Sequence, residues 1–250
     1  MKKCFLEGYG ECDRKLTGEY YISRNVLESI SMGKKKISIG GLSWQPESTL
    51  QQIGIGSLAS NILCYKHNSG LSSLDTLAGK FYRFLNDVDK DPYNVSVHCK
   101  IDGESIERWF LKVLCGLTKS SSIKGCSFKD IWLEILNGSE WPISWGLYVP
   151  IPEDSQILNK EFYVSLKVNP KTKEILAADF RVAGVPFIMV FGVPDKSENF
   201  GVFRPRGLIF NTPSGERRLE FIWKHISEKA IIYNKVGTTK ELPPQHQEWK

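Results

Sequence analysis

The chain has 250 residues, of which 41% are hydrophobic and 12% are aromatic, enough to bury a substantial core. Charged residues make up 24% of it and leave no apolar run near the ~20 residues that a membrane helix needs. Collagen-like, coiled-coil, disordered and transmembrane classes are therefore excluded. The formal net charge of +5 favours anionic partners without deciding among them. Because the apolar patch before Glu7 is too short for a secretory signal, the sequence predicts a cytoplasmic protein with no membrane partner.

Residues 1–71 are rich in turns. Residues 36–39 alternate apolar and polar, and Gly40-Gly41 follows them, which predicts a hairpin with residues 42–44. From Ser72 onward, seven apolar positions between Leu74 and Val88 recur at three- and four-residue steps, the pattern of an amphipathic helix. The sequence therefore predicts a turn-rich segment up to residue 71, followed by a long helix.

The rest of the chain predicts helices first and strands afterwards. Apolar periodicity indicates helices at 104–117 and 127–137. Short aromatic or β-branched runs then predict strands at 146–151, 161–168, 174–182, 186–192, 206–210, 217–223 and 230–236. The predicted class is α+β: an N-terminal unit over residues 1–90, then two helices and a mainly antiparallel sheet or open barrel over 91–250. A single α+β domain is the alternative.

Two patches of the N-terminal unit carry metal-binding side chains. Cys4 and Cys12 form one pair, and Cys64 and His67 form another at a spacing that lets both face one ion at a turn. Three thiols and one imidazole suit tetrahedral Zn²⁺ with no open position. The spacing therefore predicts a structural zinc that stabilises a unit short of core. The alternative is that the cysteines are ordinary thiols and His67 is a turn residue.

The order of these motifs resembles the His-Asn-His (HNH) endonucleases, the ββα-metal nucleases, in the form that carries a zinc knuckle. The matching segments are the Cys4/Cys12 pair, Leu16-Thr17-Gly18-Glu19-Tyr20, Asn61-Ile62-Leu63-Cys64 and His67-Asn68. The resemblance covers about a third of the chain. It implies a zinc-stapled ββα-metal unit that acts on DNA by metal-assisted phosphodiester hydrolysis, in a setting such as phage defence.

The resemblance also implies roles for four residues. Tyr20 stands where the family has the histidine that acts as general base, and Asn61 stands where an asparagine orients that histidine. Asn68 stands where a residue helps to bind a catalytic Mg²⁺ or Mn²⁺, and Glu19 could add a carboxylate. The phenol of Tyr20 has a usual pKa near 10 and is a poor base at neutral pH.

Three explanations of Tyr20 stay open. The chain is a nuclease with weak or lost activity, a nuclease that uses Tyr21, Glu19 or His98 differently, or a non-catalytic zinc-containing module that binds nucleic acid or protein.

Basic clusters supply candidate contacts to nucleic acid. They are Lys34, Lys35 and Lys36 before the predicted hairpin, and Arg204 and Arg206 in the C-terminal half. The alternative is that they are solvated surface charges. DNA is the expected partner, and a homodimer or a protein partner is compatible with the same sequence.

Overall fold

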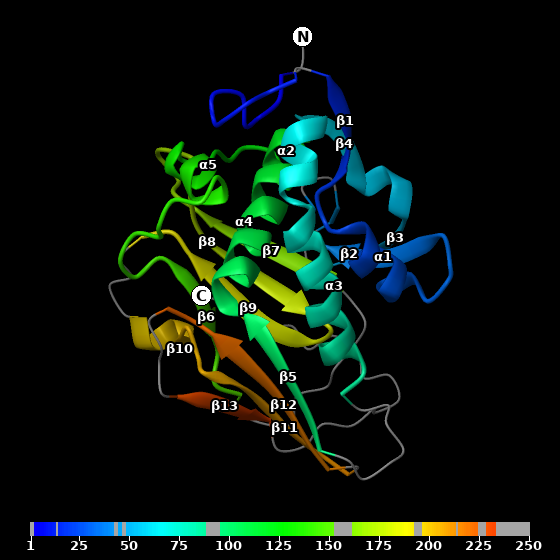
Figure 1. Cartoon of the computed structure of the whole chain (residues 1–250), viewed down its shortest axis with the longest axis vertical. Helices are drawn as coiled ribbons and strands as arrows, with labels where there is room; N and C mark the ends of the chain where they lie inside the picture. The colour runs from blue at the N-terminus through cyan, green and yellow to red at the C-terminus, as the bar shows by residue number, and fades with distance from the viewer. Residues whose placement is uncertain are drawn as a thin grey trace.

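Three β-sheets and the helices that pack on them make up the fold (Figure 1). The computed structural model describes residues 3–13, 15–42, 45–46, 49–88, 96–152, 162–192, 197–213, 215–224 and 229–233. The strands are β1 (Leu16–Tyr20), β2 (Lys36–Gly40), β3 (Leu50–Gly54), β4 (Ala59–Cys64), β5 (Val97–Asp102), β6 (Gly146–Val149), β7 (Phe162–Val168), β8 (Ile175–Val182), β9 (Val185–Val190), β10 (Val202–Phe203), β11 (Gly207–Thr212), β12 (Gly215–Ile222) and β13 (Ala230–Tyr233). The helices are α1 (Arg24–Ser31), η1 (Ile55–Leu58), α2 (Tyr65–Gly70), α3 (Ser72–Asn86), α4 (Gly103–Lys119), α5 (Ile131–Leu136) and η2 (Ser197–Phe200).

Most of the strands belong to two larger sheets. One has the order β10-β6-β9-β8-β7-β2-β3, and the other has the order β13-β11-β12-β5. Within them, β2–β7, β11–β13 and β12–β5 pair in parallel, and the remaining pairs are antiparallel. The third sheet is the antiparallel pair β1–β4, which leads directly into α2.

Helices α3 and α4 cover the seven-stranded sheet and connect it to the four-stranded one (Figure 1). The ring of Phe110 on α4 lies 4.6 Å from that of Phe180 on β8, between ring centroids. Phe81 on α3 lies 5.4 Å from Phe187 on β9 and 6.2 Å from Phe221 on β12. Because one helix face contacts both sheets, a single hydrophobic core holds most of the buried side chains.

The predicted α+β class is confirmed, and α3, α4 and α5 lie where the apolar periodicity predicts helices. Each predicted strand region between residues 146 and 236 contains a strand, although residues 234–236 lie outside the described ranges. The predicted single sheet or barrel is wrong, because these strands divide between two sheets. Local patterns report a strand's faces but not its distant neighbours, which is why the division was missed.

The predicted hairpin partner of β2 is also wrong. β2 pairs along its whole length with β3, with Lys36 opposite Gly54, while residues 43 and 44 of the predicted partner lie outside the described residues. Gly41 has a φ of +86°, and a Cβ there would come within 1.5 Å of the Val164 carbonyl oxygen. The glycine is therefore needed for close passage past β7 and not for a tight turn between strands.

The predicted boundary at residue 90 falls in residues 89–95, outside the described ranges. Contacts join the two sides of it: β2 pairs with β7, and α3 packs on α4. Among the described helices, none has the length and apolar character that crossing a membrane requires.

Candidate functional site

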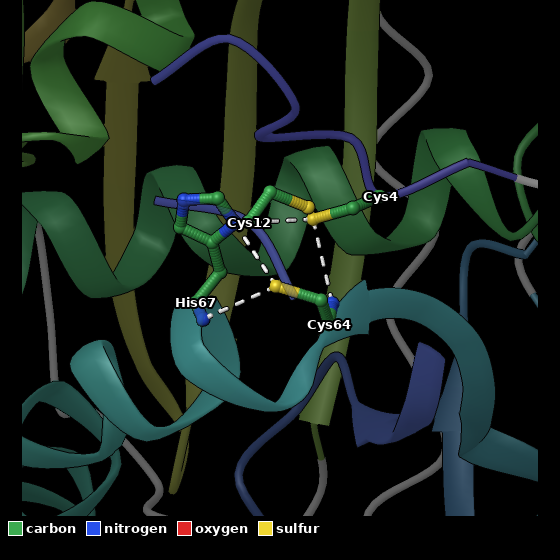
Figure 2. A group of neighbouring side chains, drawn as sticks. All are labelled: Cys4, Cys12, Cys64 and His67. Carbon is green, nitrogen blue, oxygen red and sulfur yellow. Dashed lines mark hydrogen bonds between the residues drawn. The ribbon is translucent and has the colours of Figure 1, made fainter. Parts of the chain in front are cut away.

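Four metal-binding side chains point toward one another where the N-terminal loop meets the start of α2 (Figure 2). Cys4 and Cys12 lie on the loop before β1, Cys64 ends β4, and His67 lies on α2. Their ligand atoms all lie within 4.8 Å of one another. The Nδ1 atom of His67 is 3.2 Å from the Sγ atom of Cys4 and 3.2 Å from that of Cys64. The predicted convergence of these four residues is confirmed.

Backbone hydrogen bonds fix the orientation of this cluster. The Cys64 amide donates to the Sγ atom of Cys4 over 3.4 Å, and the His67 amide donates to the Sγ atom of Cys64 over 3.5 Å, which caps α2. The Nε2 atom of His67 lies 2.8 Å from the Tyr9 carbonyl oxygen. A proton on Nε2 satisfies that carbonyl and leaves the Nδ1 lone pair facing the thiols, the usual arrangement of a metal-binding histidine.

The spacing of the four atoms suits a tetrahedral ion. Metal–sulfur bonds of about 2.3 Å and metal–nitrogen bonds of about 2.0 Å place the ligand atoms about 3.5–3.8 Å apart. Burial raises the pKa of the Cys4 thiol to about 11, so the protein alone keeps it protonated, and a bound cation would take the place of that proton. The cluster can therefore hold one metal ion, and its four ligands fill a tetrahedral shell.

A pocket of about 470 Å³ lies next to this cluster, between β1, α1 and the start of α2 and α3. Its wall is formed by Gly18, Glu19, Tyr20, Arg24, Asn25, Glu28, Asn68 and Asp75. Asn68 directly follows His67, and its Nδ2 atom donates to the Thr17 hydroxyl over 3.1 Å, which ties α2 to β1. The pocket and the metal-binding cluster therefore meet at α2, which carries both His67 and Asn68.

A buried lysine lies behind the pocket wall. The Nζ atom of Lys112 on α4 is 2.5 Å from the Oε1 atom of Glu19 and 2.6 Å from the Oδ1 atom of Asp75. The Lys112 side chain is only 2% exposed. The Ser23 hydroxyl donates to the same Asp75 oxygen over 2.5 Å, and the Trp109 indole N–H donates to Ser23 over 2.8 Å. This network extends from the helix core to the pocket.

The pocket carries more acid than base. Burial raises the pKa of Glu19, and the neighbouring Lys112 ammonium opposes that rise. Arg24 and Glu28 form an exposed ion pair, with 2.8 Å between Nε and Oε1, so their charges nearly cancel. The Oδ1 atom of Asn25 is buried without a hydrogen-bond partner, while its Nδ2 atom donates to the Asp75 carbonyl. A wall that carries more acidic than basic side chains suits a cationic ligand.

Three of the four residues to which the resemblance assigned catalytic roles line this pocket: Glu19, Tyr20 and Asn68. The fourth, Asn61, is exposed on β4 opposite Gly18 and is not part of the pocket wall. Tyr21 is buried and donates its hydroxyl to the Ser57 carbonyl, and His98 lies on β5 beside Glu220. Neither lines the pocket, so neither is placed to act there.

The two predicted basic clusters lie far apart. Lys34, Lys35 and Lys36 are exposed after α1, and Arg206 is exposed before β11. Five strand spacings of about 4.8 Å separate β2 from β10 across the sheet, on the order of 24 Å. Lys36 on β2 and Arg204, which follows β10, therefore lie near opposite edges of the seven-stranded sheet.

Arg204 does not serve as a surface cation. Its guanidinium makes two hydrogen bonds, of 2.9 and 3.0 Å, to the carboxylate of Glu107, which is fully buried on α4. The same guanidinium lies over the rings of Phe203 and Trp223. The pair connects α4 to the segment between β10 and β11, a structural role that the sequence did not indicate.

Sequence reasoning missed Lys112 and the pocket role of Asp75. Asp75 lies in the first turn of α3, where a carboxylate is favourable in any case. Lys112 follows the buried Leu111 and lies three positions after Trp109, so a charged residue on an apolar helix face was the available signal. No protein-family model, curated protein or solved structure matches the chain.

Proposed function

We propose that the Cys4/Cys12/Cys64/His67 cluster binds one structural Zn²⁺. Three thiols and one imidazole are the donors that zinc prefers, and four ligands leave no position for a substrate. The hydrogen bond between His67 and the Tyr9 carbonyl supports a metal-binding tautomer. Zinc would hold the N-terminal loop against β4 and α2, next to the pocket.

We propose further that the protein is an HNH-like endonuclease, or derives from one, and acts on DNA at the pocket by metal-assisted hydrolysis. One observation carries this proposal: Glu19, Tyr20 and Asn68, chosen from the resemblance alone, line a single pocket. The antiparallel pair β1–β4 and α2, which follows it, are compatible with a ββα unit in which α1, β2, β3 and η1 are inserted between the two strands.

The pocket wall includes residue types that a hard divalent ion prefers as ligands. They are the carboxylates Glu19 and Asp75 and the amides Asn25 and Asn68. These residues would hold Mg²⁺ or Mn²⁺, which would stabilise negative charge on a phosphodiester. The chain's own contribution is to orient these oxygens and to exclude bulk water from Glu19.

Plasmid nicking tests the endonuclease. Zinc-loaded protein with Mg²⁺ or Mn²⁺ is expected to nick supercoiled plasmid, and Asn68→Ala and Glu19→Gln are expected to lower the rate at least about 10²-fold. Glu216→Gln, an exposed carboxylate on β12, serves as the control. EDTA should abolish nicking. Because EDTA also removes zinc, the protein is then reloaded with zinc, and nicking should return only when Mg²⁺ is added. Nicking that survives both pocket variants contradicts the proposal.

A second candidate is a non-catalytic zinc-containing module that binds nucleic acid or protein. The identity of Tyr20 favours it, because a phenol accepts a proton poorly near neutral pH. DNA binding without metal-dependent nicking would support this candidate and contradict the first.

The nuclease and the nucleic-acid-binding form of the second candidate both predict electrostatic binding of DNA near the pocket. Arg24, Asn25 and Glu28 of α1 line the pocket, and Lys34, Lys35 and Lys36 follow the far end of that short helix. Replacing these three lysines with alanine is expected to flatten the log–log salt dependence of binding by up to about 2.7, since each lost phosphate contact removes about 0.9. Fluorescence anisotropy over a salt series measures this slope. Replacing the exposed Lys167, Lys171 and Lys173 should leave it unchanged, and equal effects of both triples would contradict the assignment.

A further inference from the structure

Lys112 belongs to the long helix α4, and its ammonium group contacts two carboxylates of the pocket wall. Its Nζ atom bridges Glu19 and Asp75, two residues of the pocket wall. Only 2% of its side chain is exposed, so it does not meet a ligand directly. Lys112 therefore acts on the pocket through the two carboxylates.

Packing does not explain why this position carries a charge. Leu111 and Val113 on either side of Lys112 are fully buried, as is Trp109 one turn before it. Taking an ammonium and its partners out of water is expensive, and a well-packed apolar group is often as stable as a buried ion pair. The ammonium is therefore better explained by what it does to Glu19 and Asp75.

The ammonium changes both the charge and the geometry of the pocket wall. It offsets one of the two carboxylate charges, which leaves a net charge near −1 for this trio. It also fixes Asp75, because Lys112 and the Ser23 hydroxyl both bond to Oδ1. Among the contacts of the described residues, Oδ2 of Asp75 is then the oxygen left for a ligand in the pocket.

We propose that Lys112 is a positioning residue that orients Glu19 and Asp75 and, by neutralising one charge, sets the affinity of the pocket for a divalent cation. This inference rests on the proposed function, in which that cation takes part. It also gives the C-terminal two thirds of the chain a role at the pocket, because α4 supplies the lysine.

Manganese binding tests the proposal without any assay of cleavage. Zinc-loaded full-length protein is titrated with Mn²⁺, and free Mn²⁺ is measured by electron paramagnetic resonance. Lys112→Met is expected to bind Mn²⁺ at least about tenfold more tightly than the wild type, because the ammonium no longer competes with the divalent ion for the carboxyl groups of Glu19 and Asp75. Lys112→Arg keeps the charge and should stay within about threefold of the wild type.

Two controls separate this role from general packing. Arg204→Met removes the cation of another buried pair, with Glu107, and should leave Mn²⁺ affinity unchanged. Adding Asp75→Asn to Lys112→Met should abolish the gain. If Lys112→Met does not fold, Lys112→Gln makes the same change in charge and keeps a hydrogen-bond donor.

Equal Mn²⁺ affinity in the wild type and the neutral variants would overturn the proposal, as would a gain that Arg204→Met reproduces. The outcome is distinguishable from that of the nicking test. A Mn²⁺ shift without any nicking contradicts the nuclease and supports the role of Lys112, whereas nicking without the shift contradicts only Lys112.

Discussion

Replacing Cys64 with serine is expected to release the bound zinc and to lower the free energy of unfolding by at least about 3 kcal/mol, since binding of a structural metal adds directly to folding. The thiol is fully buried and lies 3.2 Å from the Nδ1 atom of His67. Serine is a good helix N-cap, so the hydroxyl can keep the cap of α2 that the sulfur provides. Loss of stability would therefore report the metal and not the helix end.

Inductively coupled plasma mass spectrometry measures the zinc content, and urea unfolding measures the stability. Cys99→Ser is the matched control, because this half-buried thiol on β5 lies outside the cluster and should leave both quantities unchanged. Stripping zinc from the wild type should reproduce the destabilisation, and stripping the variant should add nothing. One zinc per chain in Cys64→Ser would contradict the assignment of the ligands.

The sequence predicts the metal-binding cluster because its information is local. Cys64 and His67 are three residues apart, and a turn between a strand and a helix brings such a pair to one side. Cys4 and Cys12 needed only a loop that folds back, which the backbone bond from the Phe5 amide to the Ile62 carbonyl secures. Spacing and ligand chemistry identified the two pairs, and the order of motifs in the resemblance joined them at one ion.

The network around Lys112 could not be predicted in the same way. The residues that it joins lie on β1, α3 and α4, and nothing in the helical pattern of α4 specifies which distant carboxylates the ammonium meets. The parallel pairing of β2 with β7 could not be predicted for the same reason. It depends on a close approach at Gly41 and not on the alternation within either strand. Local periodicity predicts which face is buried, and tertiary packing chooses the partner.

Changing Tyr20 to histidine is expected to create or increase metal-dependent cleavage of DNA by about 10²–10⁴-fold, the usual contribution of a positioned general base. Tyr20 is the last residue of β1, is partly buried and lines the pocket beside Glu19 and Asn68. Imidazole accepts a proton near neutral pH and phenol does not, while both are rings with a polar tip. The folded structure should therefore tolerate the change.

Nicking rates with Mg²⁺ or Mn²⁺ measure the effect, and its dependence on pH identifies the new group. Because a histidine base must be neutral to accept a proton, the gained activity should rise as pH increases through about 6.5, the ordinary pKa of imidazole. Tyr163→His on β7, which does not line the pocket, makes the same chemical change and should give no gain.

Two outcomes would contradict this assignment of Tyr20. If the wild type and Tyr20→Phe both cleave briskly, the base lies elsewhere, and Glu19 on the same wall becomes the first residue to test. If Tyr20→His stays inactive with zinc bound and DNA affinity intact, restoring the base is not sufficient. Combining Tyr20→His with Lys112→Met then asks whether the divalent cation was the missing component, because that second change removes the ammonium that neutralises the pocket carboxylates. Inactivity of the double variant, despite tight Mn²⁺ binding, would leave the non-catalytic module as the function.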